Sequence, residues 1–350
     1  MVPNGRALVG FVVLSWCLAA SSLAAQTLPK VLVIGTGGTI SGEQAQPGTL
    51  TGYEMKRTAN DLVRAIPVLA QYAEVETEQF GQISSPDITP QDWLRLSNLI
   101  DQRFRERPDL AGIVVTHGTA RLEETAFFLY LTVRSDRPVV MAAAQRPATG
   151  ISADGPLNVL SAVRTAGSTD ARDKGVLVVM DNRILSARDV KKEYARSGGF
   201  DTGEMGMLGV VANREVEFYY EPAKRHGPAS DFDVTGVTAL PRVGITYSFA
   251  GADGEANGGA ATADAGLVVA TTGLTPAEGE YYARLRARGV VVATTFPSGE
   301  QVAHGGGDPS DPNPAVAVQH LSPLKARILL MLALARTRSA REIQALFDAY

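Results

Sequence analysis

Two threonines in this sequence each follow an apolar run and a glycine-containing turn. Residues 31–34 are aliphatic at every position, and two glycines then precede Thr39. Residues 114–118 repeat the pattern, with His-Gly directly before Thr119. A buried strand that ends in glycine turns sharply and places the next side chain at the edge of a sheet, where α/β proteins build their sites. A hydroxyl presented there could act as a nucleophile; a dinucleotide loop and a purely structural turn are the alternatives.

Several common enzyme motifs do not fit the first of these turns. A dinucleotide fingerprint has three spaced glycines; Gly35 and Gly37 match two of them, but the third position is Ile40. A Walker loop needs a lysine that this turn lacks, and a G-x-S-x-G elbow is missing from the sequence. The four histidines are far apart and lack the spacing of metal ligands. A hydroxyl nucleophile on a strand-end turn remains.

Both threonines need a sheet that brings them together. Further predicted strands alternate with helical patterns, which predicts a parallel sheet with helices on both faces. These strands occupy residues 74–80, 112–118, 138–144 and 175–180. Thr89 and Pro90 are typical of a helix start, and another helix is predicted to begin near Arg121. If the strands before Thr39 and Thr119 flank a topological switch point, their loops can meet.

A second α/β series follows a polar segment. Residues 221–236 contain proline and glycine without periodicity, which indicates a linker. Apolar runs then recur at 242–248, 265–272 and 289–295, as right-handed βαβ units require. Ser322-Pro323 are predicted to begin an amphipathic closing helix with one apolar face, formed by Leu324, Ile328, Leu329 and Leu332. The predicted organisation is a larger N-terminal α/β domain over residues 26–220, a linker over 221–241 and a smaller C-terminal α/β domain over 242–350.

Residues 1–25 are predicted to be a signal peptide. Arg6 precedes an apolar run shorter than the roughly 20 residues that span a bilayer, and small residues allow cleavage after Ala24 or Ala25; a retained anchor is the alternative. Cleavage would remove Cys17, the only cysteine in the sequence. The 33 basic and 37 acidic residues lack the basic excess of a nucleic-acid-binding protein. We expect an exported protein, periplasmic or secreted, that contacts neither nucleic acid nor, after cleavage, the membrane, and that binds a small molecule.

Five segments carry a more specific pattern. T-G-G-T-I at 36–40 and T-H-G-T…L-E-E-T-A at 116–126 are the strongest. They are joined by R-P-V-V-M-A-A-A-Q-R-P at 137–147, S-A-D-G-P-L-N at 152–158 and A-R-D-V-K-K at 187–192. Together these segments resemble the bacterial L-asparaginases, and more generally the asparaginase/glutaminase amidohydrolases, from about Lys30 to Tyr350. The predicted export and the absence of other cysteines are similar to the periplasmic type of this family.

The resemblance implies roles for individual residues. In the family the threonine of T-G-G-T-I attacks the side-chain amide carbon, and water hydrolyses the resulting acyl-enzyme; that role falls on Thr39. A lid tyrosine matches Tyr53, and a threonine and lysine that act as a base-like pair match Thr119 and Lys192. The base that activates Thr39 stays open between Tyr53 and Lys192. A serine that binds the substrate α-carboxylate matches Ser85.

The remaining implications concern the pocket, the reaction and the assembly. Gly38, Gly118 and Ala120 complete the expected substrate-binding set, and backbone N–H groups near Ala144 or Thr119 are expected to stabilise the oxyanion. The implied reaction converts L-asparagine to L-aspartate and ammonia without metal or cofactor. Similar family members are homotetramers built as dimers of dimers.

The sequence departs from the family at two places. Ala120 replaces an aspartate that pairs with the substrate α-ammonium, and loss of such a charged partner costs about 1.5–3 kcal/mol. A family asparagine of the smaller domain aligns near Leu274, and only Glu300, Asp308 and Asp311 could replace a family glutamate from the neighbouring subunit. Glutamine, another side-chain amide, or an amide without a free α-amine are therefore alternative substrates.

A periplasmic small-molecule binding protein without catalytic activity is the alternative from another class. The retained Thr39, Thr119 and Lys192 argue against it, because a pure binding protein needs no nucleophile. Within 188–196 only Lys192 is assigned a role, and the segment is otherwise predicted to be mostly a solvated run of charges. The adjacent Glu123 and Glu124 are predicted to support a helix N-terminus, His117 to have a hydrogen-bonded structural role and Asp154 to fix a turn.

Overall fold

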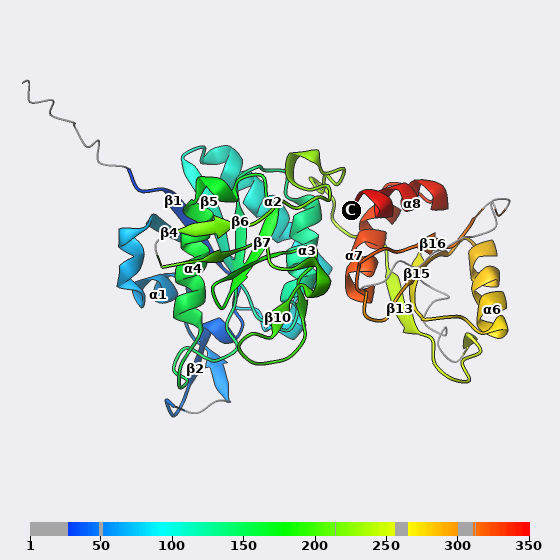
Figure 1. The fold of residues 1–350 in the computed structure, drawn as a ribbon, viewed down its shortest axis with the longest axis horizontal. Coiled ribbons are helices and arrows are strands. Elements are labelled where there is room, and N and C mark those ends of the chain that lie inside the picture. Colours follow the sequence, from blue (N-terminus) through cyan, green and yellow to red (C-terminus); the bar gives the residue numbers. More distant parts are fainter. Residues whose placement is uncertain (1–26, 49–51, 214, 256–264, 300–310, 312) are drawn as a thin grey trace, which may run out of the picture.

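The computed structural model describes residues 27–48, 52–213, 215–255, 265–299, 311 and 313–350. The chain forms a larger N-terminal α/β domain and a smaller C-terminal one beside it (Figure 1). This agrees with the predicted fold class. The predicted signal peptide, residues 1–25, lies outside the described residues, which begin at residue 27. The domain boundaries 26–220, 221–241 and 242–350 stay predictions.

The larger domain is built on an eight-stranded sheet of order β12-β11-β8-β7-β6-β5-β1-β4. Five neighbouring strands are parallel, and each arises from one of the predicted strands: β1 (Lys30–Gly35), β4 (Glu74–Gln79), β5 (Leu110–Thr116), β6 (Val139–Ala142) and β7 (Val176–Met180). The chain passes from β1 to β4 on one side and then to β5 on the other. The topological switch point therefore lies between β1 and β5.

The sheet is parallel as predicted except at one edge, which the sequence pattern did not indicate. Three short strands, β8 (Arg183–Ser186), β11 (Gly209–Val211) and β12 (Val216–Phe218), extend the sheet in antiparallel fashion. β7 and β8 are joined by Asp181 and Asn182, whose φ angles are 53° and 61°. Two consecutive positive φ angles suit a two-residue hairpin turn, and Asp and Asn tolerate them better than most residues. Asp-Asn is a weaker sequence signal for such a turn than Asn-Gly.

Helices cover both faces of this sheet, as predicted. α1 (Ala59–Arg64) and α4 (Gly155–Gly167) lie on one face, and α2 (Pro90–Glu106) and α3 (Leu122–Thr132) lie on the other. Residues 31–34 of β1 are apolar at every position because their side chains enter both layers. Val31 and Val33 pack with α1 and α4, whereas Leu32 and Ile34 pack with α2 and α3.

Local capping signals fix where the long helix α2 begins. The Thr89 hydroxyl accepts a hydrogen bond from the Asp92 N–H, and the Asp92 carboxylate accepts one from the Thr89 N–H. This reciprocal pair satisfies two backbone donors at the start of the helix, an effect worth about 1 kcal/mol. The predicted start at Thr89-Pro90 is confirmed, and α3 likewise begins directly after Arg121.

The smaller domain has a four-stranded parallel sheet of order β13-β14-β15-β16. Its strands are β13 (Val243–Tyr247), β14 (Gly266–Ala270), β15 (Val291–Thr295) and β16 (Val316–Ala317), and its helices are α6 (Pro276–Ala287), α7 (Pro323–Leu334) and α8 (Ala340–Ala349). α7 begins at Pro323 as predicted, but it is neither amphipathic nor the closing helix. It lies between the smaller sheet and α3 of the larger domain, so it is buried on almost every side, Lys325 included.

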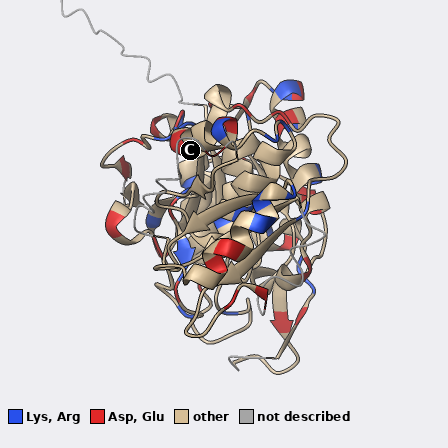
Figure 2. Cartoon of the chain, turned by 90° about the vertical axis from the view of Figure 1, so that its right-hand side faces the viewer, with Lys and Arg blue, Asp and Glu red and all other residues tan. Residues whose placement is uncertain are grey.

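Two small hairpins stand outside the main sheets. β2 (Gly42–Gln44) pairs with β3 (Tyr53–Met55), and β9 (Lys191–Lys192) pairs with β10 (Phe200–Asp201). Single 3₁₀ turns occupy Thr39–Ser41, Pro67–Gln71, Ser85–Asp87, Thr169–Ala171, Gly203–Met205 and Gly227–Ala229. Across the described ranges, no helix combines the length and apolar character needed to cross a bilayer. Basic and acidic residues are interspersed in the view of Figure 2.

Candidate active site

The two threonine turns meet at the switch point. Gly35 at the end of β1 is in register with Thr116 at the end of β5. Beyond them the backbones touch, because a Cβ atom added to Gly38 would lie 2.2 Å from the Cα of Gly118. Gly38 has a φ of 83°, a conformation that side chains other than glycine rarely adopt. The predicted meeting of the two loops is therefore present in the structure.

Thr39 is paired with Tyr53 on the first of these turns. The Thr39 Oγ1 and Tyr53 Oη atoms lie 2.8 Å apart, and either can donate the hydrogen bond. Tyr53 is positioned by the β2–β3 hairpin, where it pairs with Gln44, and its ring crosses Gly42 so closely that a Cβ there would lie 2.5 Å from the ring. Tyr53 is 41% exposed, so solvent reaches this pair.

Thr119 is paired with Lys192 on the second turn. The Lys192 Nζ donates to Thr119 Oγ1 over 2.7 Å, and Thr119 is only 7% exposed. Burial lowers the pKa of Lys192, and the negative charge of Glu123 opposes that shift. A lowered pKa enlarges the neutral fraction of the amine, which is the form that accepts a proton. The pair thus has the chemistry of a general base.

Ser85 and His117 hold the loop between these pairs. The buried Ser85 hydroxyl donates to the Gly118 carbonyl over 2.7 Å and accepts from the Arg121 N–H over 2.9 Å. His117 Nδ1 lies 2.8 Å from the same carbonyl, which requires Nδ1 to carry the proton. Burial lowers the pKa of His117 to about 4, so the ring is neutral at pH 7. His117 has the predicted structural hydrogen bond, and contact between Ser85 and a substrate stays a prediction.

The family positions that this chain has lost lie in different settings. Ala120 is exposed beside Thr119, and Leu274 is exposed in the smaller domain. Asp311, one of the three candidates for the family glutamate, forms an ion pair with Arg286 at 2.9 Å. The other two candidates, Glu300 and Asp308, lie outside the described residues.

Sequence reasoning missed part of the support around Lys192. Both Glu123 and Glu124 are buried; Glu123 Oε2 accepts the backbone N–H of Lys192 over 2.7 Å, and Glu124 pairs with Arg121 at 3.1 Å. Both residues lie in the first turn of α3, as predicted, and Glu123 has this contact with Lys192 in addition. Its place four residues after Thr119 was the available signal, because α3 starts at the edge of the site.

The prediction that 188–196 is mostly solvated holds for residues 193–196, which are exposed, but not for the start of the segment. Arg188 is buried, and its Nε donates to the Tyr350 carbonyl over 2.7 Å. By contrast, Asp154 fixes a turn as predicted: its carboxylate accepts the N–H groups of Gln145 and Arg146, each over 2.9 Å. Within the part of the chain that the structure describes, no three histidine, cysteine or acidic side chains gather as metal ligands.

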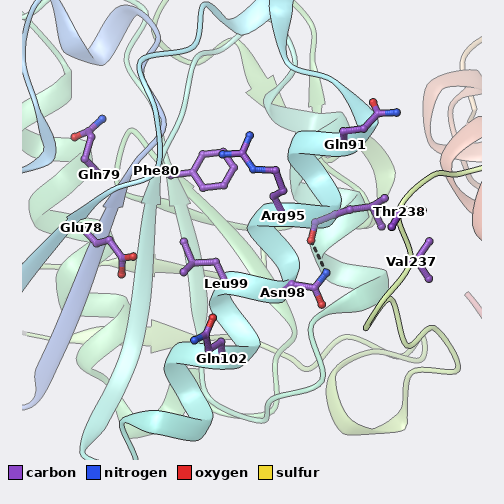
Figure 3. A pocket seen from close by; sticks show the side chains of 11 residues that line it. Glu78, Gln79, Phe80, Gln91, Arg95, Asn98, Leu99, Gln102, Val237 and Thr238 are labelled. Carbon is purple, nitrogen blue, oxygen red and sulfur yellow. Dashed lines mark hydrogen bonds between the residues drawn. The ribbon is translucent and has the colours of Figure 1, made fainter.

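A separate groove of about 710 Å³ runs between the edge strand β4 and α2 (Figure 3). On one side of the groove the Arg95 guanidinium lies over the Phe80 ring, with its carbon 4.7 Å from the ring centroid. Asn98 beside them donates to the Leu94 carbonyl over 2.9 Å. The lining of this groove includes neither threonine turn, so the groove is distinct from the candidate active site.

Two family models match the chain. The asparaginase N-terminal model covers residues 30–224, and the glutaminase/asparaginase C-terminal domain model covers residues 242–347. The chain belongs to the asparaginase family. Members of this family are amidohydrolases, and this protein is therefore an amidohydrolase.

Relatives of this asparaginase-family protein cover nearly all of it. L-asparaginase 2 of Bacillus subtilis (strain 168) is 37% identical over 338 residues, which is 95% of this chain and 89% of the relative. Glutaminase-asparaginase of Pseudomonas fluorescens biotype A is 36% identical over 363 residues, 100% of this chain and 98% of the relative. Among solved structures, the probable cytoplasmic L-asparaginase from Campylobacter jejuni matches with a TM-score of 0.85 at 34% identity, over 92% of this chain and 100% of that one.

Proposed function

We propose that this protein hydrolyses the side-chain amide of L-asparagine to L-aspartate and ammonia, with Thr39 as the nucleophile. The observation that carries the proposal is the pair of hydroxyl contacts at one switch point: Thr39 with Tyr53 at 2.8 Å, and Thr119 with Lys192 at 2.7 Å. The names of the matched relatives, L-asparaginase and glutaminase-asparaginase, support the substrate class.

The first half of the reaction acylates Thr39. Its Oγ1 forms a bond to the amide carbon while its proton passes to the Tyr53 oxygen in contact with it, and the Tyr53 hydroxyl gives its own proton to the amide nitrogen. The carbon–nitrogen bond then breaks, and the protonated nitrogen leaves as ammonia. An alcohol is a poor nucleophile at neutral pH unless a neighbouring group accepts its proton, and Tyr53 is in hydrogen-bond reach.

The second half of the reaction releases the acid. Water attacks the acyl carbon, and the Thr119–Lys192 pair accepts its proton through Thr119 Oγ1. The ester bond to Thr39 breaks, and the proton returns to the Thr39 oxygen. The lowered pKa of Lys192 favours this role, because burial increases the fraction of neutral amine.

A second candidate substrate is an amide without a free α-amine. Ala120 supplies no charge beside the site, and the exposed Leu274 supplies none in the smaller domain. A substrate with an α-ammonium would lose about 1.5–3 kcal/mol relative to a site with a charged partner. Succinamic acid, which is asparagine without its amine, tests this alternative, and glutamine tests the longer side chain.

The experiment is ammonia release from asparagine, glutamine and succinamic acid by the wild type and by Thr39→Ala. We expect the variant to lose more than about 10⁴-fold in kcat, because the nucleophile is gone. Thr238→Ala, which changes an exposed threonine outside the site, is the matched control. Turnover retained in Thr39→Ala would refute the mechanism. Ligand binding without turnover in the wild type would favour the binding protein.

We further propose that the protein is exported and forms a homotetramer. Export is supported by the basic, apolar and small-residue order of residues 1–25, and the tetramer by the family resemblance. Cell fractionation with N-terminal sequencing tests export: a mature terminus after Ala24 or Ala25 is expected. Light scattering on the purified protein tests the assembly, and a monomer with full activity would contradict it.

A further inference from the structure

A lysine of the smaller domain is buried next to the candidate active site. Lys325 lies on α7 and is only 1% exposed. Its Nζ donates to the carbonyl of Arg188 over 2.7 Å and also to the carbonyl of Val190. The ring of Phe127 on α3 lies 5.8 Å from the same nitrogen. The ammonium is therefore enclosed by the segment before Lys192 and by the helix that follows Thr119.

That segment has little support from secondary structure. β9, which carries Lys192, has two residues and pairs only with β10, outside the main sheet. Turn hydrogen bonds from the N–H groups of Asp189 and Val190 to the Ser186 carbonyl hold the start of the segment, and side chains hold it on either side. From the larger domain, Glu123 accepts the Lys192 N–H over 2.7 Å; toward the smaller domain, Lys191 Nζ donates to the Ser298 carbonyl over 2.6 Å. Lys325 adds two hydrogen bonds, to the carbonyls of Arg188 and Val190 just before β9.

We propose that Lys325 is a positioning residue for amide hydrolysis: its ammonium fixes the carbonyls two and four residues before Lys192 and thereby sets the reach of Lys192 to Thr119. This inference rests on the proposed role of Lys192 as a base. A proton-transfer pair works only within hydrogen-bond distance, and small displacements of such groups cost large factors in rate. Lys325 touches neither of the paired atoms, so it acts through the backbone.

The burial of a charge makes a role in packing alone a poor explanation. Burial lowers the pKa of Lys325 to about 8, and Glu123 opposes that shift. An apolar side chain of the same length would fill the same volume without the cost of removing a charge from water. What only the lysine supplies is a set of donors that reaches two carbonyls of one segment.

Lys325→Met is the test variant, and Leu330→Ala is its matched control. Leu330 lies on the same helix but faces the smaller sheet, where its Cδ2 is 3.0 Å from the position of a Cβ on Gly266. Both variants weaken the packing of α7, but only the first removes the contacts to the segment before Lys192. We expect Lys325→Met to lose at least about tenfold in kcat with KM within about twofold, and Leu330→Ala to keep its kcat at temperatures where both are folded.

Hydrogen exchange gives a readout that needs no substrate. In Lys325→Met, the amides of residues 189–192 should exchange faster than in the wild type, and in Leu330→Ala they should not. A folded Lys325→Met with wild-type kcat and unchanged exchange would overturn the inference, as would an equal loss of kcat in Leu330→Ala. If Lys325→Met does not fold, Lys325→Gln takes its place, and wild-type kcat in that variant would overturn it.

The failure of this inference can be told from the failure of the proposed function. If Thr39→Ala and Lys192→Met both keep full turnover, the proposed function fails whatever Lys325 does. If those two variants are inactive while Lys325→Met behaves as the wild type, only the positioning role fails. Faster exchange at 189–192 with unchanged kcat would show that Lys325 holds the segment without setting the rate, which also overturns the inference.

Discussion

The two hydroxyl pairs of the site have almost the same length and differ in their exposure to solvent. Thr39 and Tyr53 are 2.8 Å apart on the β2–β3 side, where Tyr53 is 41% exposed. Thr119 and Lys192 are 2.7 Å apart in a partly buried contact: Thr119 is only 7% exposed, and Lys192 is half-buried. The distances alone do not distinguish the pairs; their burial does. An exposed hydrogen bond competes with water, whereas a buried one acts in a medium of lower effective dielectric constant.

This difference in exposure corresponds to two requirements: substrate must reach the nucleophile Thr39, and the base must be positioned before substrate binds. The nucleophile must be reached by substrate, so its pair stays open to solvent until a ligand displaces the water. The base is held before any substrate arrives, because Glu123 fixes the backbone of Lys192 and the loop of Thr119 is fixed by Ser85. We therefore expect substitutions on the buried side to cost more than removal of the tyrosine hydroxyl on the open side.

Lys192→Met should show the largest effect of the three substitutions that probe this comparison. Removal of the amine deprives the buried pair of its proton acceptor, and we expect kcat to fall about 10³-fold. Lys174→Met removes the same side chain from a site where its Nζ pairs with Glu221 at 2.9 Å, and it should keep kcat within about twofold. Steady-state ammonia release measures both. A loss in Lys192→Met of less than tenfold would break the comparison.

Tyr53→Phe should have a smaller effect. It removes the group that takes the Thr39 proton, but in this solvent-exposed pair water can partly replace it, so we expect kcat to fall about 10²-fold. Tyr219→Phe, which removes the hydroxyl of another exposed tyrosine, serves as the control. The same ammonia assay applies. If Tyr53→Phe were as inactive as Lys192→Met, solvent exposure would not determine how much kcat each pair contributes. Tyr53 would then be the dominant base.

His117→Gln should have the smallest effect on turnover and a specific effect on stability. The pKa of His117 is about 4 in the folded chain because of burial, against about 6.5 when unfolded. Below pH 6.5 the unfolded state binds a proton at His117 and the native state does not. The contribution of this group to the free energy of unfolding is therefore complete above pH 6.5 and is lost as the pH falls toward 4. The loss from this group is about 3 kcal/mol at pH 4.

Urea unfolding at pH 7 and at pH 4 measures this contribution. Other groups also titrate in that range, so the quantity of interest is the difference between the wild type and His117→Gln. The variant should lose less stability than the wild type over the same interval. An equal loss in both proteins would mean that His117 is not held neutral by burial, and the buried side of the site would be more open than the contacts indicate.

The parts of the fold that the sequence predicts are those with local causes. Residues 31–34 are apolar at every position because the strand is covered on both faces, and α2 begins at Pro90 because Thr89 and Asp92 cap it. The meeting of Thr39 and Thr119 follows from a general rule about strand ends in parallel sheets. The antiparallel edge was missed because strands of three or four residues leave little pattern.

Long-range burial of charge could not be predicted. Glu123, Arg188 and Lys325 are residue types that are rarely buried, so the sequence favours a place for them at the surface. Each is buried because a partner distant in the chain satisfies it, as the Tyr350 carbonyl does for Arg188. The same cause made α7 appear amphipathic: its polar positions face another domain and not water.

The position of α7 also orders events during synthesis. Every residue of α3 from Leu122 to Thr132 is buried, and α7, which covers part of α3, begins only at Pro323. When the ribosome has synthesised the whole larger domain, it has therefore not yet synthesised α7, which packs against α3 of that domain. Contacts between segments so far apart in the chain form late and slowly. The site around Thr119 is thus completed only when nearly the entire chain is available, and a nascent chain truncated before α7 would expose apolar surface beside an unfinished active site.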